Sequence, residues 1–334
     1  MYAIRRTTSE QDEATQRIIA AGLPGIRLDI HGAGLHIHSN VPETIDLVRE
    51  GYAFFERDAD DDLGGRHIWH LLSLSKDGAD YDHHADMLFP DGPLPRHCLV
   101  CPDYHRVYCY ATHPTLHYAV GSFFTAAMEA MLYDDFLIVH GAAVVGDTGI
   151  IFPGALRCGK TTLTLSLIYE GYPFATDDIV LVNRRSLEVY PYPRLLNLRR
   201  ESLYLVRGVH RDYHKMTYSE SFGEPRWFMT KSECAAPPFK CGYVVFPKIV
   251  GGESRLVPLS KADAALRLIE QSFHPITPIK RFGATGENLP TLSRLLADAQ
   301  CFELLQGLPQ DSLKLLRPLL GAPPKRRPAA RAGS

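Results

Sequence analysis

The chain has 334 residues, of which 45% are hydrophobic and 22% are charged, and its formal net charge is −2. This is the composition of an ordinary globular protein, so it excludes collagen-like and wholly disordered chains. It also excludes a globally basic nucleic-acid binder, and no nucleic-acid partner is expected. The length predicts about two domains, or one large domain with an appended module.

No segment of the sequence is expected to enter a membrane. There is no run of about 18 apolar residues, which a transmembrane helix needs. The segment that starts at Met1 lacks the apolar core of a signal peptide. The seven cysteines are odd in number and scattered, which favours reduced thiols. These features predict a cytoplasmic protein without a membrane partner.

Residues 1–130 are predicted to form a separate N-terminal α+β module. A helix is expected over 42–50, because Asn40 lies in the N-cap region and Pro42 suits a first helical turn. The other predicted elements are strands at 67–72 and 98–110 and a buried helix at 116–132.

Two groups in this module are candidate metal sites. Cys98 and Cys101 form a C-x-x-C with histidines nearby, which is a zinc-ligand spacing. The same residues also fit a β-hairpin that includes Cys109. The segment Asp82–Asp86 offers carboxylates and imidazoles to a metal, or is a solvated loop.

Residues 131–320 are predicted to form a second domain of mixed α/β class, followed by a disordered basic tail over 321–334. A strand at 137–145 and a returning strand at 150–153 flank a hairpin turn. Further strands are predicted at 172–176, 179–183, 187–190, 243–247 and 255–259, and helices at 160–170, 290–299 and 311–320 and after the cap Ser260.

The strongest motif follows the strand at 150–153 and matches G-x-x-x-x-G-K-[ST], the Walker A phosphate-binding loop. Its glycines let backbone amides point at phosphate oxygens, and the following helix adds its positive end. Lys160 would reach the β- and γ-phosphates, and the Thr161 hydroxyl would hold Mg²⁺. The predicted nucleotide-binding residues are Gly154, Ala155, Leu156, Arg157, Cys158, Gly159, Lys160, Thr161 and Thr162.

Two alternatives accompany this motif. The segment is otherwise a strand–loop–helix connection that binds nothing. Cys158 is either a reactive thiol beside Lys160 or a bystander.

A pair of acids follows the loop at short range. Asp177 and Asp178 come 16 and 17 residues after Thr161, separated from it by one helix and one short strand. Adjacent residues of an extended segment point to opposite sides, so one acid could bind Mg²⁺ while the other faces an incoming hydroxyl. The alternative is a polar turn with two solvated acids.

From His140 to Asp178 the sequence resembles the kinase domain of HPr kinase/phosphorylase and its relatives. The resemblance rests on a histidine-led strand, the loop, a helix that ends at Glu170-Gly171 and the acid pair. It implies a P-loop core of the HPr-kinase/PEP-carboxykinase type. It also implies Asp177 as the base on a serine hydroxyl, Asp178 at the metal and His140 near the terminal phosphate. Without the resemblance, His140 is equally a core histidine at a strand end.

The sequence differs from the motifs of that family in two places. Leu156-Arg157-Cys158 replaces the small residues of the family's loop, and the glycine-rich signature of the bifunctional enzymes is not found. In the nearest segment, Arg194 and Arg199 could stabilise transferred charge, or they are solvated. The pattern resembles HPr-kinase-related proteins of peptide biosynthesis, among them kinases of lasso-peptide precursors.

The sequence therefore predicts a kinase that uses ATP and Mg²⁺ on a serine of a peptide or protein, such as the C-terminal serine of a lasso-peptide precursor. Residues 1–130 would then recognise the peptide, and a homo-oligomer is expected. The alternatives are a small-molecule kinase, for example of free serine, and a nucleotide-binding regulatory or scaffold protein without transfer activity.

Overall fold

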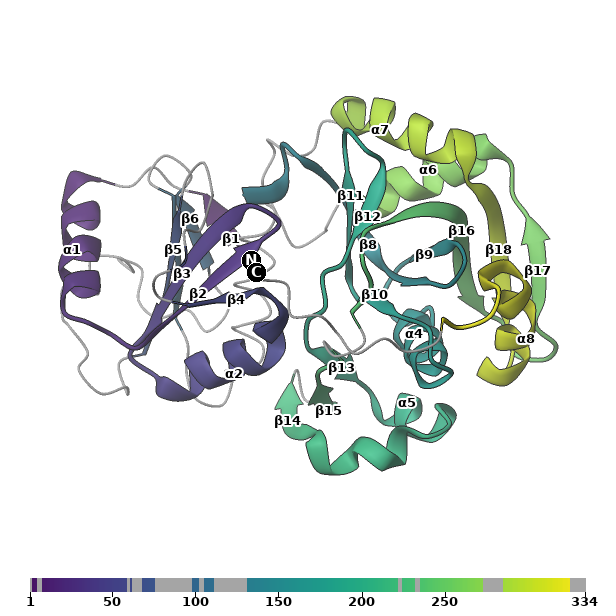
Figure 1. Cartoon of the computed structure of the whole chain (residues 1–334), viewed down its shortest axis with the longest axis horizontal. Helices are drawn as coiled ribbons and strands as arrows, with labels where there is room; N and C mark the ends of the chain where they lie inside the picture. Colours follow the sequence, from purple (N-terminus) through teal and green to yellow (C-terminus); the bar gives the residue numbers. More distant parts are fainter. Residues whose placement is uncertain are drawn as a thin grey trace. The chain divides into compact units, whose positions relative to one another are not determined.

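Figure 1 shows the computed structural model of the chain, which describes residues 2–4, 8–58, 61, 68–75, 98–101, 105–110, 131–221, 224–231, 235–272 and 285–324. Its contacts divide it into two compact units, one mainly of residues 1–133 and the other mainly of residues from 134 onward. Both combine helices with sheets, so the chain is of mixed α/β class. No helix in the described part is long and apolar enough to cross a membrane.

Three predicted features lie outside the described residues. They are the segment Asp82–Asp86, all but the last two residues of the helix at 116–132, and the tail beyond residue 324. Their interpretations stay predictions, as does the peptide-recognition role of residues 1–130.

The first unit is built on a seven-stranded sheet with the order β1-β6-β7-β5-β3-β2-β4. Its elements are β1 (Tyr2–Ile4), α1 (Ser9–Ala20), β2 (Gly25–Ile30), β3 (Ala33–Ser39), α2 (Pro42–Tyr52), the 3₁₀ turn Ala53–Phe55, β4 (Glu56–Arg57), β5 (Trp69–Leu74), β6 (Cys98–Cys101) and β7 (Arg106–Tyr110). β3, β5 and β7 are parallel neighbours, whereas β2–β3 and β6–β7 are antiparallel pairs. The predicted helix at 42–50 is confirmed by α2, and the predicted strands at 67–72 and 98–110 are confirmed by β5, β6 and β7.

The predicted N-cap role of Asn40 is wrong. Val41 is the N-cap of α2, and Asn40 is buried. Its amide instead exchanges two hydrogen bonds of 2.7 and 2.8 Å with the backbone of Ser75. A buried amide needs such partners, so Asn40 ties the end of β3 to the end of β5.

The hairpin interpretation of the cysteine segment is confirmed. β6 and β7 pair antiparallel, with Cys98 opposite Cys109. Helix α1 was not predicted, although Thr8 and Gln11 form a capping box at its start. The β2–β3 hairpin was not predicted either, although the alternating apolar residues Ile26, Leu28 and Ile30 are a strand signal.

The second unit contains an eight-stranded sheet and a three-stranded one. Its elements are β8 (Phe136–Val145), β9 (Gly149–Pro153), α4 (Lys160–Tyr169), β10 (Phe174–Thr176), β11 (Ile179–Asn183), β12 (Glu188–Tyr190), β13 (Leu196–Leu198), α5 (Arg200–Leu205), the 3₁₀ segment Val209–Lys215, β14 (Thr217–Ser221), β15 (Glu224–Met229), β16 (Phe239–Ile249), β17 (Arg255–Pro258), α6 (Lys261–Gln271), α7 (Thr285–Asp298), β18 (Gln300–Gln306) and α8 (Pro309–Leu320). The strands and helices predicted here are confirmed within a few residues.

Helices cover the two faces of the large sheet. α6 and α7 pack on one face through residues such as Leu268 and Leu295. α4 and α8 pack on the other through Leu163, Leu167 and Leu316, and Figure 1 shows the two helix pairs on opposite sides of the strands. The far side of α4 contacts α5 and the small sheet. α4 is therefore held on both sides, which fixes the direction of its N-terminus.

Four described strands of this unit were not predicted, namely β13, β14, β15 and β18. β18 lies between β16 and β17, in parallel with β16 and antiparallel to β17. Its sequence, QCFELLQ, does not alternate cleanly, and its place depends on partners more than 40 residues away. This strand carries Gln306 to the predicted site.

Candidate functional site

Strand β8 and its three neighbours β9, β10 and β11 bring the predicted site residues together. β9 runs along one edge of β8 and ends opposite Gly141. β10 and β11 run along the other edge, with their pairing interrupted at Asp177 and Asp178, where the Gly141 amide donates to the Asp178 carbonyl at 3.2 Å. The loop 154–159 and the acid pair therefore flank the same point of β8, next to His140.

The side chain of Lys160 is turned into its own loop. Lys160 is buried, and its ammonium donates to the carbonyl oxygens of Gly154 at 2.7 Å and Ala155 at 2.9 Å. The same nitrogen lies 3.2 Å from His140 Nε2. All three of these acceptors are neutral, so an anion in the loop would give the ammonium a stronger partner.

The contacts of His140 define its tautomer. Its Nδ1 lies 3.1 Å from the Asp178 carbonyl oxygen, which can only accept a hydrogen bond. Nδ1 therefore carries the proton, and the lone pair of Nε2 faces the ammonium of Lys160. The ring is neutral in this arrangement and links the loop to the acid pair.

Asp177 follows β10 in the chain, and its side chain contacts the hydroxyl of Thr161 in the first turn of α4. Thr161 Oγ1 donates to Asp177 Oδ2 at 2.8 Å. Burial and the neighbouring Asp178 raise the pKa of Asp177 to about 7, against the opposing effects of the Thr161 hydrogen bond, Lys160 and Arg194. A carboxyl group with a pKa near neutrality is suited to general-base chemistry.

The premise that the acid pair lies in an extended segment is wrong. Asp178 has a φ of +74°, in the left-handed region. It lies in the short connection between β10 and β11, where neither strand pairs with β8. Aspartate tolerates the left-handed region better than most residues. Asp177 is buried rather than solvated, so the interpretation as a solvated turn is wrong as well.

The loop is held in place by a residue that the sequence analysis did not single out. Gln306, at the end of β18, is buried and donates from Nε2 to the Cys158 carbonyl at 2.7 Å. Gly159 has a φ of +100° and leaves no room for a side chain, since a Cβ there would lie 2.7 Å from that same nitrogen. Nothing near the motif in sequence points to Gln306.

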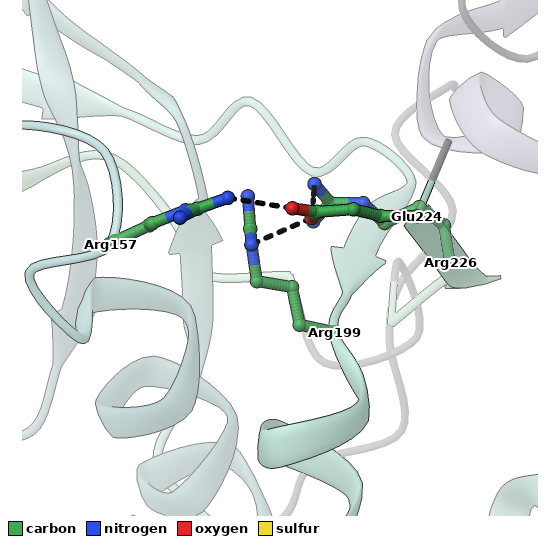
Figure 2. A network of polar contacts seen from close by, with 4 residues as sticks. All are labelled: Arg157, Arg199, Glu224 and Arg226. Atoms are coloured by element: carbon green, nitrogen blue, oxygen red, sulfur yellow. Dashed lines mark hydrogen bonds and ion pairs between the residues drawn. The ribbon is translucent and has the colours of Figure 1, made fainter. Parts of the chain in front are cut away.

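Three arginines converge on one carboxylate beside the loop (Figure 2). Arg157 of the loop, Arg199 at the start of α5 and Arg226 of β15 lie 2.7, 2.8 and 2.9 Å from the Glu224 oxygens. Burial and Arg199 lower the pKa of Arg226, and among the described residues its buried Nε has no hydrogen-bond partner. The cluster carries two more positive than negative charges and is suited to an anion.

The remaining predicted residues are distributed as follows. Thr162 Oγ1 lies 3.0 Å from Ser202 Oγ, and Leu156 is 75% exposed. Burial raises the pKa of Cys158, although Lys160 opposes it, which favours the thiol over the thiolate. Arg194 is half-buried and close enough to Asp177 to lower its pKa, so it is not a solvated arginine.

The donor set of this site fits Mg²⁺. Asp178 adds a carboxylate beside Thr161 and Asp177. Oδ1 of Asp177 is buried and has no hydrogen-bond partner among the described residues, so it is open to the proton of an acceptor. Thr161 Oγ1 gives its proton to Asp177 and keeps lone pairs for a cation. Carboxylate and hydroxyl oxygens are the ligands that Mg²⁺ prefers.

No family model and no curated protein matches the chain. Among solved structures, the chain is similar to the HPr(Ser) kinase/phosphatase from Coxiella burnetii, with 12% identity and a TM-score of 0.24. The match covers 53% of this chain and 90% of that one. A similarity at this level assigns neither fold nor activity, so the site is interpreted from its own residues.

Proposed function

We propose that the chain is a phosphotransferase that uses ATP and Mg²⁺ to phosphorylate a serine hydroxyl. The observation that supports this most strongly is the contact between Thr161 and the buried Asp177, next to the loop that holds Lys160. A phosphate loop, a hydroxyl suited to a metal and a base with a pKa of about 7 meet there.

In this proposal the loop amides and Lys160 bind the β- and γ-phosphates, and Lys160 leaves its carbonyl partners to do so. Thr161 and Asp178 would hold Mg²⁺, which neutralises charge on the phosphate oxygens when bound. Asp177 accepts the proton of the serine hydroxyl while the serine oxygen forms its bond to the γ-phosphorus. The bond from that phosphorus to the β–γ bridging oxygen breaks, and ADP leaves with the electron pair.

The arginine cluster supports an anionic acceptor. Arg157, Arg199 and Arg226 share Glu224, and an anion that replaces Glu224 would gain three guanidinium partners. The α-carboxylate of a C-terminal serine is such an anion, which favours a peptide that ends in serine. A homo-oligomer and a cytoplasmic location stay predictions from the sequence.

The proposal is tested with purified full-length chain, Mg²⁺ and γ-labelled ATP. The acceptors are peptides that end in serine, the same peptides as C-terminal amides, peptides that end in alanine, and free serine. Intact mass should show one added phosphate on the serine-ended acids and less on the amides. Transfer to free serine alone would support the small-molecule alternative, and ATP binding without transfer would support the regulatory alternative.

Variants separate the roles within the site. Thr161→Val and Asp178→Asn should raise the Mg²⁺ concentration needed for half-maximal transfer. Asp177→Asn should lower kcat without that change. Thr164→Val is the matched control, because Thr164 lies buried on the same helix and its hydroxyl has no hydrogen-bond partner among the described residues. An unchanged Mg²⁺ requirement in Thr161→Val would contradict the metal assignment.

A further inference from the structure

The first unit contains a group of three histidines that converge on one face of its sheet. His36 and His38 are two residues apart on β3, so their side chains share a face. β5 runs parallel to β3 with His70 opposite His36, which places a third ring on that face. Ring nitrogens of the three residues all lie within 4.8 Å of one another.

The spacing of the rings approaches that of a metal site. Tetrahedral coordination with a Zn–N distance of about 2.1 Å places ligand nitrogens about 3.4 Å apart. His38 Nε2 and His70 Nδ1 already lie 3.4 Å apart, and the ring centroids of His36 and His38 are separated by 3.9 Å. A rotation of the His36 ring about its side-chain bonds would close the remaining distance.

The surroundings leave room for the rings and shield them from water in part. His38 is only 3% exposed, and His36 and His70 are half-buried. Gly25 lies opposite His38 in β2, and a Cβ there would approach His36 Nε2 to 3.2 Å. Leu72, which pairs with His38 on the other side, is fully buried.

Burial and a nearby cation favour a neutral His36 ring. Burial and the nearby Arg27 lower the pKa of His36, and a neutral imidazole is the form that binds a metal. The guanidinium of Arg27 donates to the carbonyl oxygens of Asp58 and Asp61, which draw it toward that loop. Three close imidazole rings, each with a nitrogen lone pair, are stabilised together by one cation.

We propose that His36, His38 and His70 form a Zn²⁺ site. Imidazole nitrogens suit zinc and do not suit Mg²⁺, which prefers oxygen. Three protein ligands leave the fourth position open to water or to a donor atom of a ligand. The site is independent of the proposed phosphotransferase site, which has oxygen donors and lies in the other unit.

The test is metal binding by the full-length chain after removal of metals with a chelator. Zn²⁺ is added, and its stoichiometry is measured by elemental mass spectrometry after gel filtration. Co²⁺ serves as a spectroscopic probe, because tetrahedral coordination gives strong visible absorption. Each is measured for the wild type, His36→Gln, His38→Gln and His70→Gln, with the exposed His210→Gln as the matched control.

We expect one Zn²⁺ per chain in the wild type and in His210→Gln. Each of the three ligand variants should bind more than about 100-fold more weakly, since loss of an outer-shell partner alone costs about 10- to 100-fold. Excess Mg²⁺ should not displace the ion. Equal binding by wild type and ligand variants, or no binding by the wild type, would overturn the proposal.

A second measurement uses the wild type only and so does not depend on whether the variants fold. Diethyl pyrocarbonate modifies accessible imidazoles, and peptide mapping locates the modified residues. Zn²⁺ should protect His36 and His70 from modification while leaving His210 reactive. Modification of His36 and His70 at the same rate with and without Zn²⁺ would contradict the site.

Discussion

Asp177 and Asp212 are both buried carboxyl groups of the second unit, at 3% and 8% exposure, yet their surroundings differ. Asp212 accepts hydrogen bonds of 2.6 Å from Lys231 and from Tyr169. Burial raises the pKa of Asp212, but these bonds outweigh it, so its pKa lies below the usual value. Asp177 has one hydroxyl donor and an acidic neighbour, and its pKa is raised to about 7.

The difference separates a carboxylate that stabilises the fold from one that is available for chemistry. The ion pair of Asp212 and Lys231 lies against the ring of Tyr169, at 4.9 Å from the ammonium, and anchors the end of α4. The contacts of Asp177 do not compensate for the free energy that its ionisation costs, so its pKa stays raised. Groups of the second kind concentrate at functional sites.

The largest expected effect is on transfer. Asp177→Asn should lower kcat by about 10²- to 10⁴-fold, because general-base catalysis is worth that much. Asp212→Asn should leave kcat per folded molecule within a few fold, because Asp212 is bonded to Lys231 and Tyr169. The measurement is phosphate transfer under saturating ATP and acceptor, normalised to folded protein. Equal losses in the two variants would remove the distinction between them.

The next effect is on the pH dependence of stability. The folded-state pKa of Asp177 is raised from 3.8 to about 7, so its ionisation destabilises the fold as pH rises through that window. Asp177→Asn should therefore be more stable than the wild type by up to about 4 kcal/mol above pH 7. The two should be equally stable below a pH of about 4. Urea unfolding of the ligand-free chain across this range measures the difference, and a constant difference at all pH values would contradict the raised pKa.

A smaller effect on stability is expected when the ion pair of Asp212 and Lys231 is broken. Lys231→Met leaves Asp212 without its buried cation and should cost about 3 kcal/mol of unfolding free energy. Lys215→Met is the control, since Lys215 contacts the same carboxylate at 3.3 Å but is 58% exposed, and exposed pairs contribute about 1 kcal/mol or less. Similar losses in both variants would show that burial does not set the strength of this pair.

The smallest effect is expected from removing the contact between Gln306 and the loop 154–159. Gln306→Ala removes the hydrogen bond to the Cys158 carbonyl and should cost about 1 kcal/mol of stability. It should also raise the KM for ATP more than it lowers kcat, because it acts through the loop that would bind the phosphates in the proposed function. Gln300→Ala, at the exposed start of the same strand, is the control. An unchanged KM would show that Gln306 does not position the loop.

The sequence by itself determined the local elements of the site. The hairpin turn at 146–148 with its two strands, the glycine-rich loop and the helix that begins at Lys160 are encoded by turn residues and apolar spacing within about 30 residues. The acid pair Asp177-Asp178 was also predicted, because its distance from Thr161 can be counted along the sequence. The helices that cover the sheet were predicted for the same local reason.

Only the tertiary structure decided which distant residues join these elements. Gln306 reaches the loop through a strand whose place depends on long-range pairing. Glu224 lies beside Arg226 on β15 and also contacts Arg157 and Arg199 from two distant segments, which no spacing along the chain reveals. His36 and His70 meet because two strands 34 residues apart lie parallel, whereas the sequence directed attention to the cysteines and to Asp82–Asp86. Local propensity encodes what a segment becomes, but pairing across a sheet decides what it lies beside.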